Sequence, residues 1–146
     1  MNVFVANEQD LPVDETRLST LARHVMGAGG VDDSIELSIL LVTSDHIRKL
    51  NSRFAGNDYA TDVLAFPMLD EDDAEDEAML GDVVICPEVA ESNAKRFGHT
   101  IDREVETLLA HGVLHLLGYD HQGTEDKERM DKRLKEVLES FKPEVA

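Results

Sequence analysis

The eleven residues from 111 to 121, HGVLHLLGYDH, constrain the fold more than any other part of the chain. Two histidines four residues apart lie on neighbouring turns of one helix face, about 40° apart around the axis. Glycine tolerates the left-handed conformation that ends a helix, so Gly118 predicts a reversal of the chain. That reversal would bring His121 back toward the first two imidazoles. The spacing therefore predicts a long helix, a turn, and a metal site formed by His111, His115 and His121.

Three neutral imidazoles are typical zinc ligands, and they leave the fourth tetrahedral position to water, as in catalytic zinc sites. Zinc lowers the pKa of such a water to about 7. We therefore expect one Zn2+ per chain, although imidazoles also accept nickel or iron. The alternative is three unrelated histidines. Against it, half of the six histidines fall within these eleven residues, and a buried helix face ordinarily carries Leu or Ile.

The same spacing, H-x3-H-x2-G-x2-H, also occurs in metzincin proteases, which carry a glutamate directly after the first histidine as general base. Gly112 occupies that position here. Glycine cannot accept a proton, so peptide hydrolysis by the usual route lacks its base. A metzincin-like metalloprotease is thus favoured by the spacing and opposed by residue 112.

The segment closely resembles the signature of the YbeY family, bacterial endoribonucleases and ribosomal-RNA maturation factors. Three further segments of that family follow in the same order, Leu50-Asn51, TDVLAFP at 61–67 and LGDVV at 80–84, and the resemblance spans about residues 1 to 140. It implies a zinc-dependent, single-strand-specific endoribonuclease that acts in maturation of small-subunit ribosomal RNA and in ribosome quality control. It also implies His111, His115 and His121 as zinc ligands, with ribosomal RNA and ribosomal or ribosome-assembly proteins as partners.

One segment departs from the family pattern. Family members commonly read aromatic-Arg-Gly before TDVL, and that arginine has been proposed to act on the phosphate. The matching residues 54–56 are FAG, with Ala55 in place of arginine, and the nearest arginine is Arg53. A guanidinium reaches well beyond its backbone, so Arg53 is a candidate substrate-binding residue; the alternative is a solvated helix residue beside Arg48 and Lys49. The departure keeps open a non-catalytic ribosome-assembly factor with a structural zinc.

Hydrophobic spacing and capping residues predict one domain of the α+β class over residues 1–146. Helices are expected from Asp14 to the glycines at 27, 29 and 30, from a Ser44 cap through Phe54, from Pro87 to Gly98, from Thr100 through Leu117, and from Gly123-Thr124 through Phe141. Strands are expected at 35–43, 61–67 and 80–86. The last two strands could pair as a hairpin, which gives a mixed sheet packed with helices, with the metal site on a long helix and the turn after it.

Charge and composition limit the classes of function. The net charge is −17, which opposes generic nucleic-acid binding. Seven of the eight residues at 70–77 are acidic, so −10 remains without that segment, which we interpret as a solvated loop between two strands. The residues that could line a phosphate-binding groove are Arg48, Lys49, Arg53, Lys95, Arg96 and Arg103.

The sequence also favours a cytoplasmic protein. It has no apolar stretch of about 18 residues that could span a membrane. Its first residues lack the basic region and apolar run of a signal peptide. Cys86 is the only cysteine, so an internal disulfide is excluded, and we expect it to be a small buried hydrophobic residue.

Overall fold

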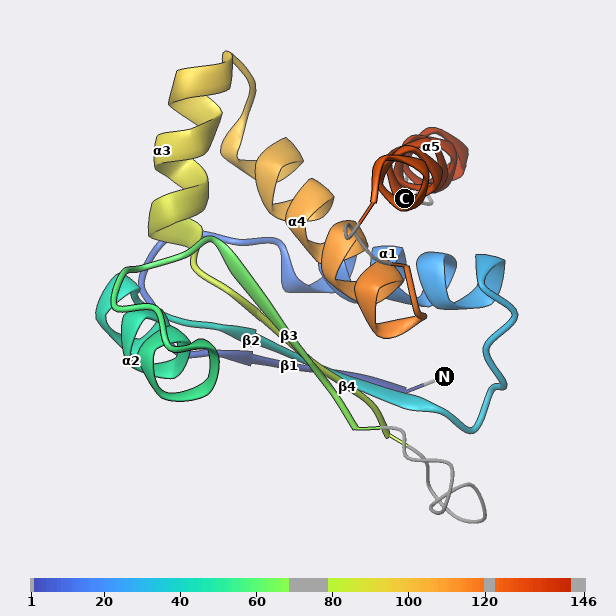
Figure 1. Ribbon diagram of the computed structural model, residues 1–146, viewed down its shortest axis with the longest axis horizontal. Helices are drawn as coiled ribbons and strands as arrows, with labels where there is room; N and C mark the ends of the chain where they lie inside the picture. The colour runs from blue at the N-terminus through green and yellow to red at the C-terminus, as the bar shows by residue number, and fades with distance from the viewer. Residues whose placement is uncertain (1, 69–78, 120–122, 143–146) are drawn as a thin grey trace.

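A mixed four-stranded sheet forms the centre of the computed structural model, which describes residues 2–68, 79–119 and 123–142 (Figure 1). The strands are β1 (Asn2–Asn7), β2 (Glu36–Leu41), β3 (Val63–Pro67) and β4 (Met79–Ile85), in the spatial order β1-β2-β4-β3. β1, β2 and β4 run parallel, whereas β3 and β4 pair antiparallel. The pairing of β3 with β4 confirms the expected hairpin, the mixed sheet and the α+β class.

Helices cover the two faces of the sheet unequally (Figure 1). α1 (Glu15–Ala28), α3 (Pro87–Phe97), α4 (Ile101–Leu116) and α5 (Thr124–Ser140) lie on one side, and α2 (Ser44–Ala55) lies on the other. The larger hydrophobic cluster packs α1 and α4 against the sheet, through residues such as Leu21, Val25, Ile39, Val83 and Leu109. A smaller cluster of Val42, Ile47, Val84 and Cys86 packs beneath α2.

Two glycines set how closely α4 approaches the sheet. A Cβ placed on Gly112 would lie 2.7 Å from Cγ1 of Val83, so the helix backbone rests directly on β4. Gly81 of β4 has φ +154°, and a Cβ there would meet the carbonyl oxygen of Phe66 and come within 2.9 Å of Leu116. Glycine is the residue that permits such close approach of one backbone to another. The helix α4 therefore packs closely against β4 at two positions, Gly112 and Gly81.

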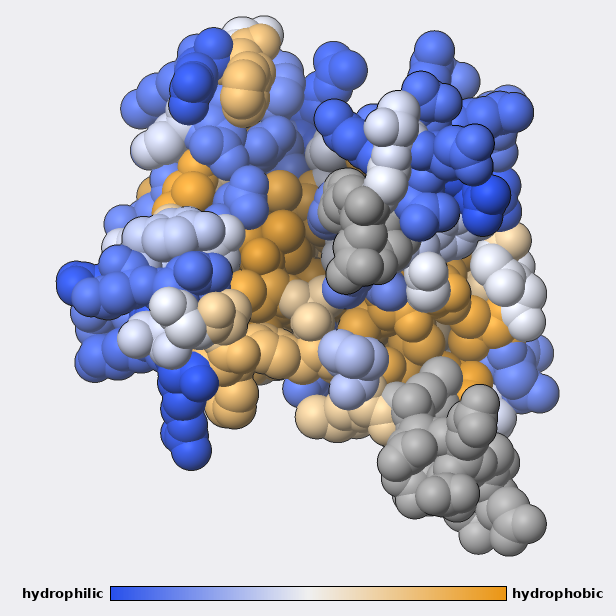
Figure 2. Space-filling view, in the orientation of Figure 1, coloured by the Kyte–Doolittle hydropathy of each residue, from blue (hydrophilic) through white to orange (hydrophobic). Residues whose placement is uncertain are grey.

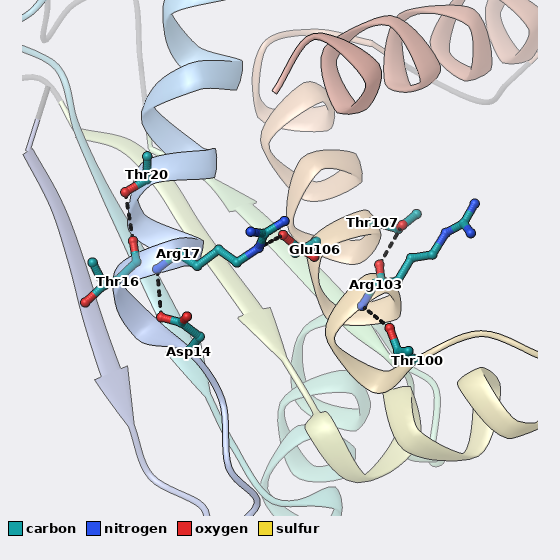
Figure 3. Close-up of polar contacts among 8 residues, drawn as sticks. All are labelled: Asp14, Thr16, Arg17, Thr20, Thr100, Arg103, Glu106 and Thr107. Atoms are coloured by element: carbon teal, nitrogen blue, oxygen red, sulfur yellow. Dashed lines mark hydrogen bonds and ion pairs between the residues drawn. The ribbon is translucent and has the colours of Figure 1, made fainter. Parts of the chain in front are cut away.

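Polar contacts align α4 with α1 at the opposite end (Figure 3). The Asp14 carboxylate accepts a hydrogen bond from the backbone N–H of Arg17, and the Thr100 hydroxyl accepts one from that of Arg103. These bonds cap the first turns of α1 and α4, as expected for such residues. The Arg17 side chain then donates to Glu106, which joins the two helices.

The structure differs from the sequence prediction in two local features. β1 was not expected; it pairs with β2 and directs Val3 and Val5 toward the core while Phe4 is 52% exposed. The cap of α2 is Thr43 rather than Ser44, since the Thr43 hydroxyl accepts a hydrogen bond from the backbone N–H of His46. Within the described residues, no helix is long and apolar enough to cross a membrane. The acidic segment 70–77 lies outside the described residues.

Candidate metal centre

His111 and His115 lie on successive turns of α4 and are accessible to solvent. Half of the helix is buried, including Gly112, Val113 and Leu114 between them. His111 is half-buried and His115 is exposed. Residues at this spacing on a helix have Cβ atoms roughly 6 Å apart. Two imidazoles are thus presented together beside the buried face of the helix, an arrangement that suits metal ligation rather than core packing.

The chain reverses directly after the second histidine. Leu117 is the last residue before the turn, and Gly118 has φ +104°. The backbone N–H of Gly118 donates to the carbonyl oxygen of His115 (3.0 Å), and that of Tyr119 donates to Leu114 (3.1 Å). These are the two bonds of a Schellman motif, which closes a helix at a left-handed glycine. The expected helix end at Gly118 is confirmed.

The third expected ligand, His121, lies outside the described residues. The structure therefore places His111 and His115 on one face, while the role of His121 stays a prediction. Among the residues that are described, no group of three His, Cys, Asp or Glu side chains could hold a metal ion. Imidazole nitrogens are among the ligands that zinc prefers, so His111 and His115 fit two positions of a zinc site.

The surroundings of the turn favour cations and offer one basic group. The carboxyl-terminal end of a helix carries partial negative charge, which stabilises a positive ion near His115. A hollow of about 490 Å3 beside the turn is lined by Leu117, Gly118, Tyr119, Asp126 and Arg129. Arg129 could not be predicted from the sequence, because only the folded chain brings the start of α5 beside this turn.

Residue 112 has a second role that the sequence did not indicate. A side chain there would point at Val83 of β4 and, at 3.6 Å, toward Val63 of β3. The position is a packing contact between α4 and the sheet, so a glutamate placed there would meet the sheet first. A glycine inside a long amphipathic helix is the signal that could have suggested close packing.

Arg53 lies on the other side of the sheet from α4. It is exposed near the end of α2, and its guanidinium lies over the Phe54 ring, 5.2 Å from the centroid. Arg48 and Lys49 form ion pairs with carboxylates on Asp58 and Asp45. Within the described chain no carboxylate pairs with Arg53, so its charge is available to a ligand. The structure does not bring Arg53 against His111 or His115, because α2 and α4 cover opposite faces.

Three other histidines and the two basic residues of α3 lie apart from this site. His24 hydrogen-bonds to the Val137 carbonyl and the Ser140 hydroxyl of α5, and His99 contacts Glu104 at 2.9 Å. His46 lies at the start of α2, 3.9 Å from Glu8. These contacts agree with ordinary surface and packing roles. Lys95 and Arg96 lie in the last turn of α3.

The pKa is raised for two groups, Asp82 in β4 and Cys86 directly after it. Burial raises the pKa of the Asp82 carboxyl, and a hydrogen bond with the Ser38 side chain opposes that rise. Burial also raises the pKa of the Cys86 thiol. Cys86 is fully buried, which confirms the expectation of a small hydrophobic residue and excludes it as a nucleophile for an external substrate.

Comparison with known proteins identifies relatives over nearly the whole chain. The family model described as "Endoribonuclease YbeY" matches residues 4–142. A protein named Endoribonuclease YbeY from Frankia casuarinae is 43% identical and covers 97% of this chain and 75% of the relative. Its namesake from Thermobifida fusca is 41% identical, covering 97% and 95%. The solution structure of TM1509 from Thermotoga maritima is 28% identical, with a TM-score of 0.60 and 99% of both chains covered.

Proposed function

The chain belongs to the endoribonuclease YbeY family, and from that premise we propose that it is a zinc-dependent endoribonuclease which cuts single-stranded RNA in the maturation of ribosomal RNA. The observation that supports it best is the exposed His115, one turn from half-buried His111, on a helix that ends at a glycine reversal. Packing alone gives no reason for two accessible imidazoles at ligand spacing beside the buried face of a helix.

We propose that His111, His115 and His121 hold one zinc ion per chain. When bound, zinc supplies a Lewis acid that stabilises charge on a phosphoryl oxygen and makes a coordinated water more acidic. α4 holds the first two imidazoles in fixed directions because Gly112 and Gly81 seat the helix on β4. Arg53 binds RNA phosphates, since its guanidinium carries no ion pair within the described residues.

The test is a matched assay of single-stranded RNA and casein, each with and without a chelator. We expect cleavage of RNA that the chelator abolishes, and no cleavage of casein, because residue 112 offers no general base. Cleavage of casein with intact RNA would support the metalloprotease instead. Metal binding with neither activity would support an assembly factor with a structural zinc.

The ends of the RNA product define the reaction. A 2′,3′-cyclic phosphate would indicate attack by the ribose 2′-hydroxyl, whereas a 5′-phosphate with a 3′-hydroxyl would indicate attack by water. Deoxyribose at the cleaved position blocks the first route and leaves the second intact. Neither route requires a carboxylate at residue 112.

We further propose a cytoplasmic location and ribosomal or ribosome-assembly proteins as partners. The support is the family resemblance together with a single, buried cysteine, which fits a reducing compartment. Co-sedimentation of the tagged chain with small ribosomal subunits from cell extracts tests both points, and recovery only in the free fractions would contradict the partner proposal.

A further inference from the structure

An aromatic pair lies at the junction of α2 and β3, on the face of the sheet opposite α4. The rings of Phe54 and Phe66 meet edge to face, with centroids 5.4 Å apart and planes at 69°. Phe54 is nonetheless 60% exposed, because it lies near the end of α2 and its contacts with Phe66 and Arg53 cover only part of the ring. The contact with Phe66 holds the exposed ring in place, as edge-to-face pairs do.

Positive charge accompanies this exposed ring. The Arg53 guanidinium lies 5.2 Å from the Phe54 centroid, in cation–π contact. A neighbouring hollow of about 350 Å3 is lined by Arg48, Lys49 and Arg53 together with Ser52, Asp45 and Asp58. Three basic and two acidic groups make this surface locally positive on a chain whose net charge is −17.

The pair is structurally connected to the histidine-bearing end of α4. The carbonyl oxygen of Phe66 and the side chain of Leu116 both meet Gly81, and Leu116 follows His115 directly. β3 is an edge strand, so within the described residues no further strand pairs with its outer edge. Figure 2 shows hydrophobic surface between α2 and the atoms drawn in grey. The aromatic pair and the histidine-bearing end of α4 therefore border the same edge strand, on opposite faces of the sheet.

We propose that Phe54, supported by Phe66 and Arg53, is a base-stacking platform that holds one nucleotide of a single-stranded RNA substrate outside the cleavage site. Aromatic rings beside basic groups bind single strands in this way, since every base has a face that stacks on a ring. Locally positive charge favours RNA over an apolar protein partner for this surface. The inference rests on the proposed function, and it adds a substrate contact that no metal ligand supplies.

The test measures binding of a fluorescein-labelled single-stranded oligoribonucleotide to the full chain by anisotropy, in a chelating buffer so that the strand stays intact. Phe54→Leu keeps an apolar side chain and removes the ring, and binding should weaken about 5-fold to 100-fold. Phe54→Trp should restore or exceed the original affinity. The salt dependence of binding should be the same in all three proteins, because stacking releases no counterions.

Phe4→Leu is the matched control, because Phe4 is 52% exposed but lies on β1, at the other edge of the sheet. The Phe4→Leu protein should bind the oligoribonucleotide with unchanged affinity. Circular dichroism of each variant checks that the chain remains folded. Equal affinity of Phe54→Leu and the original chain overturns the platform while leaving the nuclease proposal intact. Absence of RNA binding by the original chain overturns both.

Discussion

His115 is exposed although its neighbours in α4, Val113 and Leu114, are buried. An exposed imidazole contributes little to packing, so its substitution should leave the fold almost unchanged. Asp82 is the opposite case: a partly buried carboxyl whose raised pKa reports an unfavourable charge in the folded state. The first side chain thus contributes little to stability, whereas the second reduces stability at neutral pH.

His115→Ala should remove the bound metal while changing the free energy of unfolding of the metal-free chain by no more than about 0.5 kcal/mol. The reason is that an exposed ligand is lost without creating a cavity. The measurement is metal content per chain after purification without a nickel column. His46→Ala, on α2, is the control and should retain the metal. Full metal content in His115→Ala would contradict the site.

Asp82→Asn should stabilise the protein at pH 7, with a gain that shrinks as the pH falls toward 3.8. A folded-state pKa above the ordinary 3.8 means that the charged carboxyl is disfavoured in the folded chain, so its penalty is full above the raised pKa and disappears below 3.8. Asparagine keeps an acceptor for Ser38 and carries no charge. Urea midpoints at several pH values measure this.

Asp58→Asn should change stability at pH 7 in the opposite direction from Asp82→Asn. A hydrogen bond from Arg48 lowers the pKa of Asp58, so its contribution is present above pH 3.8 and is lost as the pH falls through the lowered folded value. The asparagine variant should lose stability at pH 7 and approach the original protein in acid. Equal pH profiles for the two variants would contradict this account.

At the scale of elements, local signals predicted most helices, because capping and hydrophobic spacing are local. Asp14 caps α1, Gly98 ends α3 in the left-handed region and Thr100 caps α4, as expected. β1 escaped prediction because a six-residue edge strand gains its stability from pairing with β2, about 30 residues away in the sequence. The histidine pair was predictable from spacing, whereas the packing role of Gly112 required knowledge of what α4 contacts.

Gly112→Ala should destabilise the fold by about 1 to 2 kcal/mol, despite the better helix propensity of alanine. Its Cβ would lie 2.7 Å from Cγ1 of Val83, and a branched side chain cannot rotate freely away. In a Val83→Ala background the same change should be neutral or stabilising. Denaturant unfolding of the four proteins gives this double-mutant cycle. If Gly112→Ala lowers the free energy of unfolding equally in the Val83→Ala background, contact with Val83 is not the cause.

At the scale of the whole molecule, an RNA substrate must approach a chain of net charge −17. Long-range repulsion lowers the association rate, and the surface on α2 that we propose as the RNA contact is locally positive and so reduces this repulsion. The acidic residues at 70–77 carry seven of those charges, so −10 remains without them. Overall charge and local charge thus act in opposite directions on binding.

RNA affinity should therefore fall steeply with salt, and Arg53→Gln should reduce the slope of log K against log salt by about 0.7, the value for one phosphate contact on a single strand. Serine in place of the acidic residues at 70–77 should leave affinity unchanged or increase it. Anisotropy titrations across a salt series measure both effects. Affinity that does not vary with salt would rule out phosphate binding by Arg53.

The close packing of α4 against β4 influences the order in which parts of the protein unfold. Gly81 and Gly112 bring the helix against a strand that has partners on both sides, so neither can open without exposing the largest hydrophobic cluster. Local openings favour segments with fewer buried contacts, such as β1 at the edge and α2 on the less covered face. The helix that bears His111 and His115 thus belongs to the last unit to unfold, and the two imidazoles keep their relative positions in forms of the protein that have already lost peripheral structure.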